Sequence, residues 1–113
     1  MTGRSAISHP LPGPLVELIA DRFRALGDPT RIKILDRLHD GESTVGELTL
    51  AVGGTQQNVS KHLTTLLAAG IVARRREGNF VHYRIADPTT LALCELVCEG
   101  LRARAEALVS ASA

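Results

Sequence analysis

Near Gly70 the spacing of apolar residues in this chain changes from helical to alternating. Before Gly70 apolar side chains recur every three or four positions, at Val59, Leu63, Leu66 and Leu67. This spacing is typical of an amphipathic helix with one buried stripe. After Gly70 two alternating runs, Ile71–Arg76 and Phe80–Ile85, flank Glu77-Gly78-Asn79. This pattern predicts a β-hairpin directly after a helix.

Two further helices are predicted in the first third of the chain. The first follows Pro14 and ends at Gly27, and Asp28-Pro29 supplies the second with an N-cap and a first helical residue. The second helix ends before Asp40-Gly41. Its expected buried face consists of Ile32, Leu35 and Leu38.

A pair of short helices joined by glycines follows. Thr44-Val45-Gly46-Glu47 has the form of a capping box and predicts a third helix that ends near Val52. Gly53-Gly54 is typical of a tight turn, and Thr55 can cap the fourth helix, which Gly70 ends. Two helices joined by a short glycine turn match the helix-turn-helix pattern.

The predicted fold is mainly α-helical with one small β-hairpin between the fourth and fifth helices. Asp87-Pro88 repeats the helix-start signal and predicts a last helix that runs to near Ala107. Residues 14–108 are expected to form one domain. Residues 1–13 are expected to be a flexible arm, and residues 109–113 a disordered tail.

The formal net charge of +1 hides an uneven distribution of charge along the chain. Between Thr55 and Ile85 five Lys and Arg residues oppose one acid, Glu77, which gives this segment a net charge of +4. From Asp87 to the end two arginines oppose four acids. A basic middle segment of this kind is typical of a nucleic-acid contact.

The fourth predicted helix carries polar side chains near its N-terminal end, outside its apolar stripe. These candidate DNA-contacting residues are Gln56, Gln57, Ser60, Lys61 and His62. A recognition helix presents this end to base edges, where Gln suits adenine and Lys suits guanine or phosphate. The alternative is an ordinary solvated helix face.

The predicted hairpin adds a second basic element beside this helix. Its candidate contacts to phosphates or to the minor groove are Arg74, Arg75, Arg76, His82 and Arg84. The alternative is a charged edge hairpin, because Lys and Arg also protect strands from aggregation. The order helix, turn, helix, basic hairpin favours DNA binding.

Three segments together resemble the ArsR/SmtB family of bacterial repressors, namely Phe23–Leu35, Asn58–Leu63 and Leu66–Val72. The similarity covers roughly residues 16–101. It implies a winged helix-turn-helix homodimer, formed through the first and last helices, that binds a double-stranded DNA operator palindrome until an inducer releases it. It also implies that Gln56, Gln57, Ser60 and Lys61 contact bases and that residues 74–84 form the wing.

The metal sites of this family are not retained at the corresponding positions. One site needs two thiols within the run Glu42–Leu48, which contains none. At the other site Asp87 matches the first ligand, and we interpret it as a helix N-cap. The remaining positions hold Thr89, Gly100 and Ala103, none of which replaces an imidazole or a carboxylate. The four histidines fall on different predicted elements, so no shared histidine site is expected.

Cys94 and Cys98 lie one helical turn apart on the last predicted helix. They belong to an apolar a/d seam made of Leu91, Cys94, Cys98, Leu101, Ala105 and Leu108. Both cysteines are therefore expected to face the dimer interface. Two interpretations stay open: the thiols pack the interface as small apolar groups, or they sense a thiophilic metal ion, a metalloid or a sulfur oxidant.

The sequence favours no enzyme class. Gly53-Gly54 lacks the Lys and Ser/Thr of a phosphate-binding loop, and the cysteines lack the CxxC spacing of thiol–disulfide exchange. Two alternatives to an inducible repressor remain, a winged-helix repressor without a metal inducer and a winged-helix module that binds protein. No apolar run has the length of a membrane span or the form of a secretory signal, so we expect a cytoplasmic protein.

Overall fold

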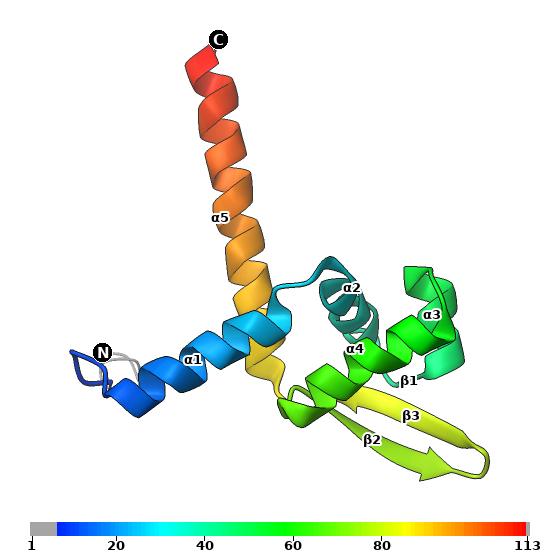
Figure 1. Cartoon of the computed structure of the whole chain (residues 1–113). Helices are drawn as coiled ribbons and strands as arrows, with labels where there is room; N and C mark the ends of the chain where they lie inside the picture. The colour runs from blue at the N-terminus through cyan, green and yellow to red at the C-terminus, as the bar shows by residue number, and fades with distance from the viewer. Residues whose placement is uncertain (1–6, 113) are drawn as a thin grey trace.

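In the computed structural model, which describes residues 7–112, five helices and three strands follow one another (Figure 1). The helices are α1 (Gly13–Leu26), α2 (Pro29–Leu38), α3 (Val45–Val52), α4 (Gln56–Ala68) and α5 (Pro88–Ser112). The strands are β1 (Ser43–Thr44), β2 (Val72–Glu77) and β3 (Phe80–Ile85). The predicted winged helix-turn-helix order is therefore confirmed, with one additional short strand.

Side-chain caps start the helices where the sequence predicted. At α2 the Oδ2 atom of Asp28 accepts a hydrogen bond from the backbone N of Arg31 at 3.1 Å. At α3 the Oγ1 of Thr44 accepts from the backbone N of Glu47 at 3.2 Å, and Oε1 of Glu47 accepts from the backbone N of Thr44 at 2.8 Å. These backbone donors lower the pKa of both carboxyl groups, because they stabilise the charged forms.

The turn between α3 and α4 depends on two glycines. Gly53 and Gly54 have φ angles of +85° and +92°, a region that residues with a Cβ rarely adopt. This turn brings α4 back across α3 and completes the helix-turn-helix predicted from the sequence (Figure 1).

The wing, which we define as β2, β3 and their connecting turn, belongs to a three-stranded antiparallel sheet in the order β1-β3-β2. The sequence predicted only the β2–β3 hairpin. Gly78 begins its two-residue turn with a φ of +61°, as a type II′ turn requires. The missed strand β1 pairs Ser43 with Tyr83 and Thr44 with His82. Two residues carry too little periodicity to predict a strand.

The hydrophobic core lies between α2, α3, α4 and the sheet. Its most deeply buried apolar side chains are Ile34, Leu35, Leu48, Val59, Leu63, Leu66 and Ile71. The predicted face of α2 was wrong at Ile32, which is 45% exposed, whereas Ile34 is 0% exposed. Helix α2 is apolar on more than one side, and packing against α3 and α4 decides which side is buried.

Helix α5 projects away from the rest of the domain (Figure 1). The Cα radius of gyration is 17.1 Å, whereas a compact domain of this length has about 13 Å. The helix runs to Ser112, past its predicted end near Ala107 and through most of the predicted tail, residues 109–113. Good helix formers and no breaker follow Leu101. Neither α5 nor any other helix within residues 7–112 is both long and apolar enough to cross a membrane.

The predicted N-terminal arm, residues 1–13, is only partly within the described range. Residues 1–6 lie outside it, and Gly13 already belongs to α1.

Candidate nucleic-acid interface

Helix α4, which we call the recognition helix, exposes a polar face opposite its buried stripe. The Oγ1 of Thr55 caps its N-terminus by accepting a hydrogen bond from the backbone N of Asn58 at 3.1 Å. Val59, Leu63 and Leu66 are fully buried, which fixes the rotation of the helix. The opposite face is exposed and carries Gln56, Gln57, Ser60 and Lys61, as predicted.

The structure adds Thr64 to this face. Gln57, Lys61 and Thr64 are exposed and recur at helical spacing, so their side chains leave the recognition helix in one direction. The Oγ1 of Thr64 donates to the carbonyl oxygen of Ser60 at 3.0 Å. The spacing from Gln57 was visible in the sequence and could have identified Thr64. A hydroxyl group can donate to or accept from a base edge.

His62 does not share this exposed face, although the sequence grouped it with the other candidates. Its side chain is 15% exposed and lies against the start of α2. The Nδ1 of His62 is 3.1 Å from Nη1 of Arg31 and 3.7 Å from Oδ2 of Asp28. His62 therefore packs inside the domain against Arg31 and Asp28, whereas Gln57 and Lys61 are exposed.

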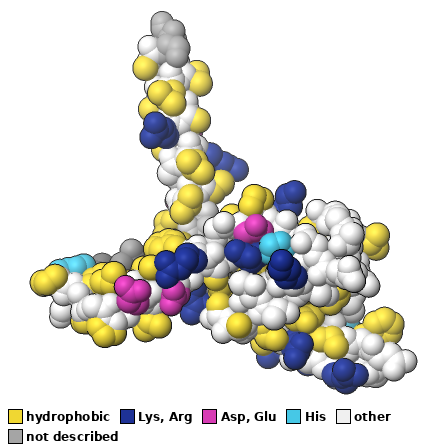
Figure 2. All heavy atoms as spheres, in the orientation of Figure 1, with side chains coloured by type: hydrophobic (Ala, Val, Ile, Leu, Met, Phe, Trp, Pro, Cys, Tyr) yellow, Lys and Arg dark blue, Asp and Glu magenta, His cyan; other side chains and the backbone are white. Residues whose placement is uncertain are grey.

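The arginines of the wing divide between the two faces of the sheet. Arg74 and Arg76 lie opposite Tyr83 and Val81 in the strand register and therefore share the face that packs on the helices. Arg75 lies opposite His82 on the other face, which also carries Arg84. Figure 2 shows basic side chains gathered on the wing.

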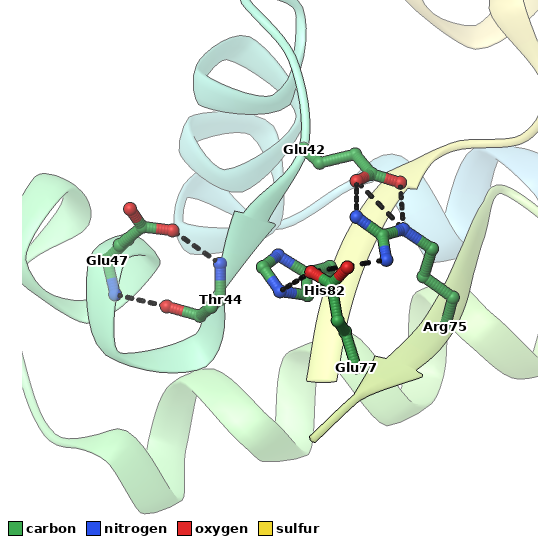
Figure 3. Close-up of polar contacts among 6 residues, drawn as sticks. All are labelled: Glu42, Thr44, Glu47, Arg75, Glu77 and His82. Atoms are coloured by element: carbon green, nitrogen blue, oxygen red, sulfur yellow. Dashed lines mark hydrogen bonds and ion pairs between the residues drawn. The ribbon is translucent and has the colours of Figure 1, made fainter. Parts of the chain in front are cut away.

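Arg75 is held by carboxylates rather than left free (Figure 3). Its Nη2 and Nε donate to Oε1 of Glu42 at 2.8 and 3.0 Å, and its Nη1 is 3.6 Å from Oε1 of Glu77. The same Glu77 oxygen lies 3.7 Å from Nε2 of His82. The hydrogen bond between Arg75 and Glu42 raises the pKa of the arginine and lowers that of the glutamate. Within residues 7–112 no ion pair involves Arg74, Arg76 or Arg84.

Replacing Arg74 and Arg76 by Ala is expected to weaken binding to all DNA sequences alike, because both guanidinium groups are free to contact phosphates. Each dimer loses four guanidinium groups, so the slope of log affinity against log salt should become shallower by about four. The Arg75→Ala variant should change this slope by less than one unit, because Glu42 already binds Arg75. Fluorescence anisotropy titrations at several salt concentrations measure both slopes. A larger change in Arg75→Ala than in the double variant would contradict this assignment.

Cys94 and Cys98 lie where α5 passes α1 and α2. Cys94 is half-buried and Cys98 is exposed, and both line two hollows that also share Ile32. Burial raises the pKa of the Cys94 thiol. Among the described residues no group of three or more His, Cys, Asp and Glu side chains is placed to hold a metal ion.

Asp87 caps α5, as the sequence predicted. Its Oδ1 accepts hydrogen bonds from the hydroxyl group of Thr89 at 2.5 Å and from the backbone N of Thr89 at 3.0 Å. The hydroxyl donor in particular lowers the pKa of the Asp87 carboxyl group. Oδ2 of Asp87 is 3.6 Å from Nη1 of Arg22 on α1.

Comparison with known proteins agrees with this arrangement. Residues 26–75 match a helix-turn-helix domain family. The uncharacterized HTH-type transcriptional regulator Rv0081 of Mycobacterium tuberculosis is 45% identical over 76 residues, which are 66% of this chain and 67% of that protein. The crystal structure of Rv0081 aligns with a TM-score of 0.69 at 38% identity, covering 90% of this chain and 100% of the other.

A second solved structure carries the family name. It is the solution structure of Mb0332 (fragment 1–100) from Mycobacterium bovis, described as a homodimeric winged helix-turn-helix DNA-binding domain and a possible ArsR-family transcriptional regulator. It aligns with a TM-score of 0.74 at 31% identity, covering 94% of this chain and 92% of the other. The chain belongs to the ArsR/SmtB family.

This ArsR/SmtB protein is a DNA-binding transcriptional repressor, with α3 and α4 as its helix-turn-helix and β2–β3 as its wing. Its relatives are transcriptional regulators. One of them, the probable mercury resistance operon repressor of Streptomyces lividans, is 42% identical over 74 residues, which are 66% of this chain and 59% of that protein.

Proposed function

We propose that this repressor binds an operator palindrome as a homodimer, with one recognition helix in each of two successive major grooves. The observation that carries this proposal is the exposed polar face of α4, next to wing arginines that no carboxylate holds. Gln57, Ser60 and Lys61 read base edges, and Arg74 and Arg76 bind phosphates. The half-sites then lie about 34 Å apart, one turn of DNA. A repressor acts at the chromosome, which agrees with the expected cytoplasmic location.

The homodimer is supported by apolar surface on the two helices that project from the domain. The exposed large apolar side chains of α1 are Leu15, Val16, Leu18, Ile19 and Phe23, and those of α5 include Leu96, Val97 and Leu101. Exposed apolar patches of this extent mark interaction surfaces. Mb0332, which has the same fold, is described as homodimeric.

Gln57→Ala and Lys61→Ala are each expected to weaken operator binding about tenfold or more, while binding to unrelated DNA changes much less. A bidentate base contact contributes about 1–3 kcal/mol of discrimination, and both side chains are free to make one. Anisotropy titrations with the DNA upstream of the protein's own gene and with a scrambled duplex measure the two affinities. Thr65→Ala is the control, because Thr65 is exposed further along the same helix and its hydroxyl group donates to the backbone carbonyl oxygen of Lys61, which leaves the Lys61 side chain unchanged.

Operator affinity that is unchanged in both variants, with folding intact by circular dichroism, would contradict the proposed docking. Phosphate contacts release counterions, so DNA affinity that rests on them falls as the salt concentration rises. DNA affinity that does not change with salt would instead favour the alternative, a winged-helix module that binds protein.

We also propose that a soft ion with two thiolate ligands releases the operator by binding Cys94 and Cys98. The two thiols lie one turn apart on α5 and line the same hollows, and soft ions such as Hg(II) prefer sulfur ligands. The described residues supply no third ligand, so the pair does not fit a tetrahedral zinc site in one subunit. The relative from Streptomyces lividans is named for mercury resistance.

Addition of Hg(II) to the reduced repressor on operator DNA is expected to release the DNA, and Cys94→Ser/Cys98→Ser is expected to abolish this response. Binding must displace a proton from Cys94, whose thiol pKa is raised, so the half-effective ion concentration should fall as pH rises. Arsenite, cadmium, zinc and a persulfide donor are tested in parallel by anisotropy. If none of them releases the wild-type protein, the cysteines pack the interface and the repressor has no thiol-bound inducer.

A further inference from the structure

Arg31 connects three separate elements of the domain. It lies in the first turn of α2, where its Nε donates to the carbonyl oxygen of Ala25 at 2.7 Å and its Nη2 to that of Arg24 at 3.3 Å. Both carbonyl groups belong to the last turn of α1, where that of Arg24 also accepts a hydrogen bond from the backbone N of Gly27 at 3.3 Å. The remaining nitrogen, Nη1, is 3.1 Å from Nδ1 of His62 in the recognition helix.

Helix α1 does not pack closely on the recognition helix. An open hollow lies between the two helices, lined by Leu18 and Ala25 on one side and by Thr65 and Ala68 on the other. The Arg31–His62 contact itself joins α2 to α4, which pack on each other, and the hydrogen bonds of Arg31 to the carbonyl groups of Ala25 and Arg24 connect the end of α1 to this pair. His62 directly follows Lys61, so a tilt of α4 at His62 also moves a side chain of the exposed polar face.

The chemistry of this contact specifies the protonation state of His62. A guanidinium group only donates hydrogen bonds, so Nδ1 of His62 must be the unprotonated acceptor and Nε2 must carry the ring proton. Oδ2 of Asp28, which accepts from the backbone N of Arg31, lies 3.7 Å from the same Nδ1. Arg31 therefore contacts both residues, Asp28 through its backbone N and His62 through its side chain.

We propose that Arg31 is a positioning residue for DNA recognition, because through His62 it sets the orientation of the recognition helix relative to the end of α1. This inference rests on the proposed function, in which α1 contributes to the dimer interface and α4 reads the operator. The contact then transmits a movement of α1 within the dimer to the bases that Lys61 and its neighbours contact.

The first test compares three variants of the full-length dimer. His62→Leu, which removes the acceptor, is expected to lower operator affinity about tenfold, with binding to unrelated DNA within about twofold of wild type. His62→Asn retains an acceptor oxygen close to the position of Nδ1 and is expected to restore operator affinity. Thr65→Ala is the control for a change on the same helix outside this contact. Thermal unfolding and sedimentation verify that each variant remains folded and dimeric.

The second test is a double-mutant cycle between Arg31 and His62, whose side chains are 3.1 Å apart. If both residues act through this one contact, Arg31→Ala/His62→Leu is expected to lower operator affinity no further than either single variant does.

Losses of operator affinity that simply add in the double variant, or unchanged operator affinity in His62→Leu, would overturn the positioning role. Failure of the proposed function has a different signature, because Lys61→Ala would then also leave operator affinity unchanged.

Discussion

The double variant Val97→Glu/Leu101→Glu is expected to be a monomer that binds the operator at least about a hundredfold more weakly than the wild type. Val97 and Leu101 are 53% and 63% exposed and lie one turn apart on the projecting helix α5. Two glutamates on each subunit would remove apolar burial from the proposed interface and place like charges across it. A monomer also loses the gain of binding two half-sites at once, which is about a hundredfold or more.

Sedimentation velocity measures the oligomeric state, and anisotropy with a two-half-site operator measures binding. Leu50→Glu is the control for the sedimentation measurement, because it also places a glutamate at an exposed leucine. Leu50 is 89% exposed but belongs to α3, away from α5 (Figure 1). This control should remain dimeric. A double variant that still sediments as a dimer would exclude this face of α5 from the interface.

Ile34→Ala is expected to lower the free energy of unfolding by about 3 kcal/mol, whereas Ile32→Ala costs about 1 kcal/mol. The same side chain is shortened in both variants, two positions apart on α2. Ile34 is 0% exposed among the core residues of α2, α3 and α4, so truncation leaves a cavity. Ile32 is 45% exposed and lines an open hollow beside Cys94, so less contact is lost.

Urea denaturation at one fixed protein concentration measures both values, because the stability of a dimer depends on concentration. Equal losses in the two variants would mean that α2 is rotated relative to this structure, with Ile32 as buried as Ile34.

The helix boundaries were predictable because they depend on neighbouring residues. Asp28 and Thr44 cap helices through hydrogen bonds to backbone groups three positions away. Gly53 and Gly54 allow the turn between α3 and α4 through their own φ angles. The outward direction of the polar side chains near Lys61 also followed from the sequence, because the buried stripe at Val59, Leu63 and Leu66 determines the opposite face.

Features that depend on distant partners could not be predicted in the same way. Sequence periodicity suggested Ile32 for the core because α2 has apolar residues on more than one side. Strand β1 exists only through pairing with β3, about forty positions later. The end of α5 was predicted too early for a local reason. Its last residues are good helix formers, but their small side chains also resemble those of a disordered tail.

The sequence by itself determined the order of elements, the helix caps, the glycine turn and the polar face of the recognition helix, because these follow from interactions over a few positions. Only the tertiary structure decided which basic side chains are free to bind DNA. Arg75 meets Glu42 across 33 positions, and His62 meets Arg31 across 31. Such partners come within hydrogen-bonding distance only after the sheet and the helices have packed.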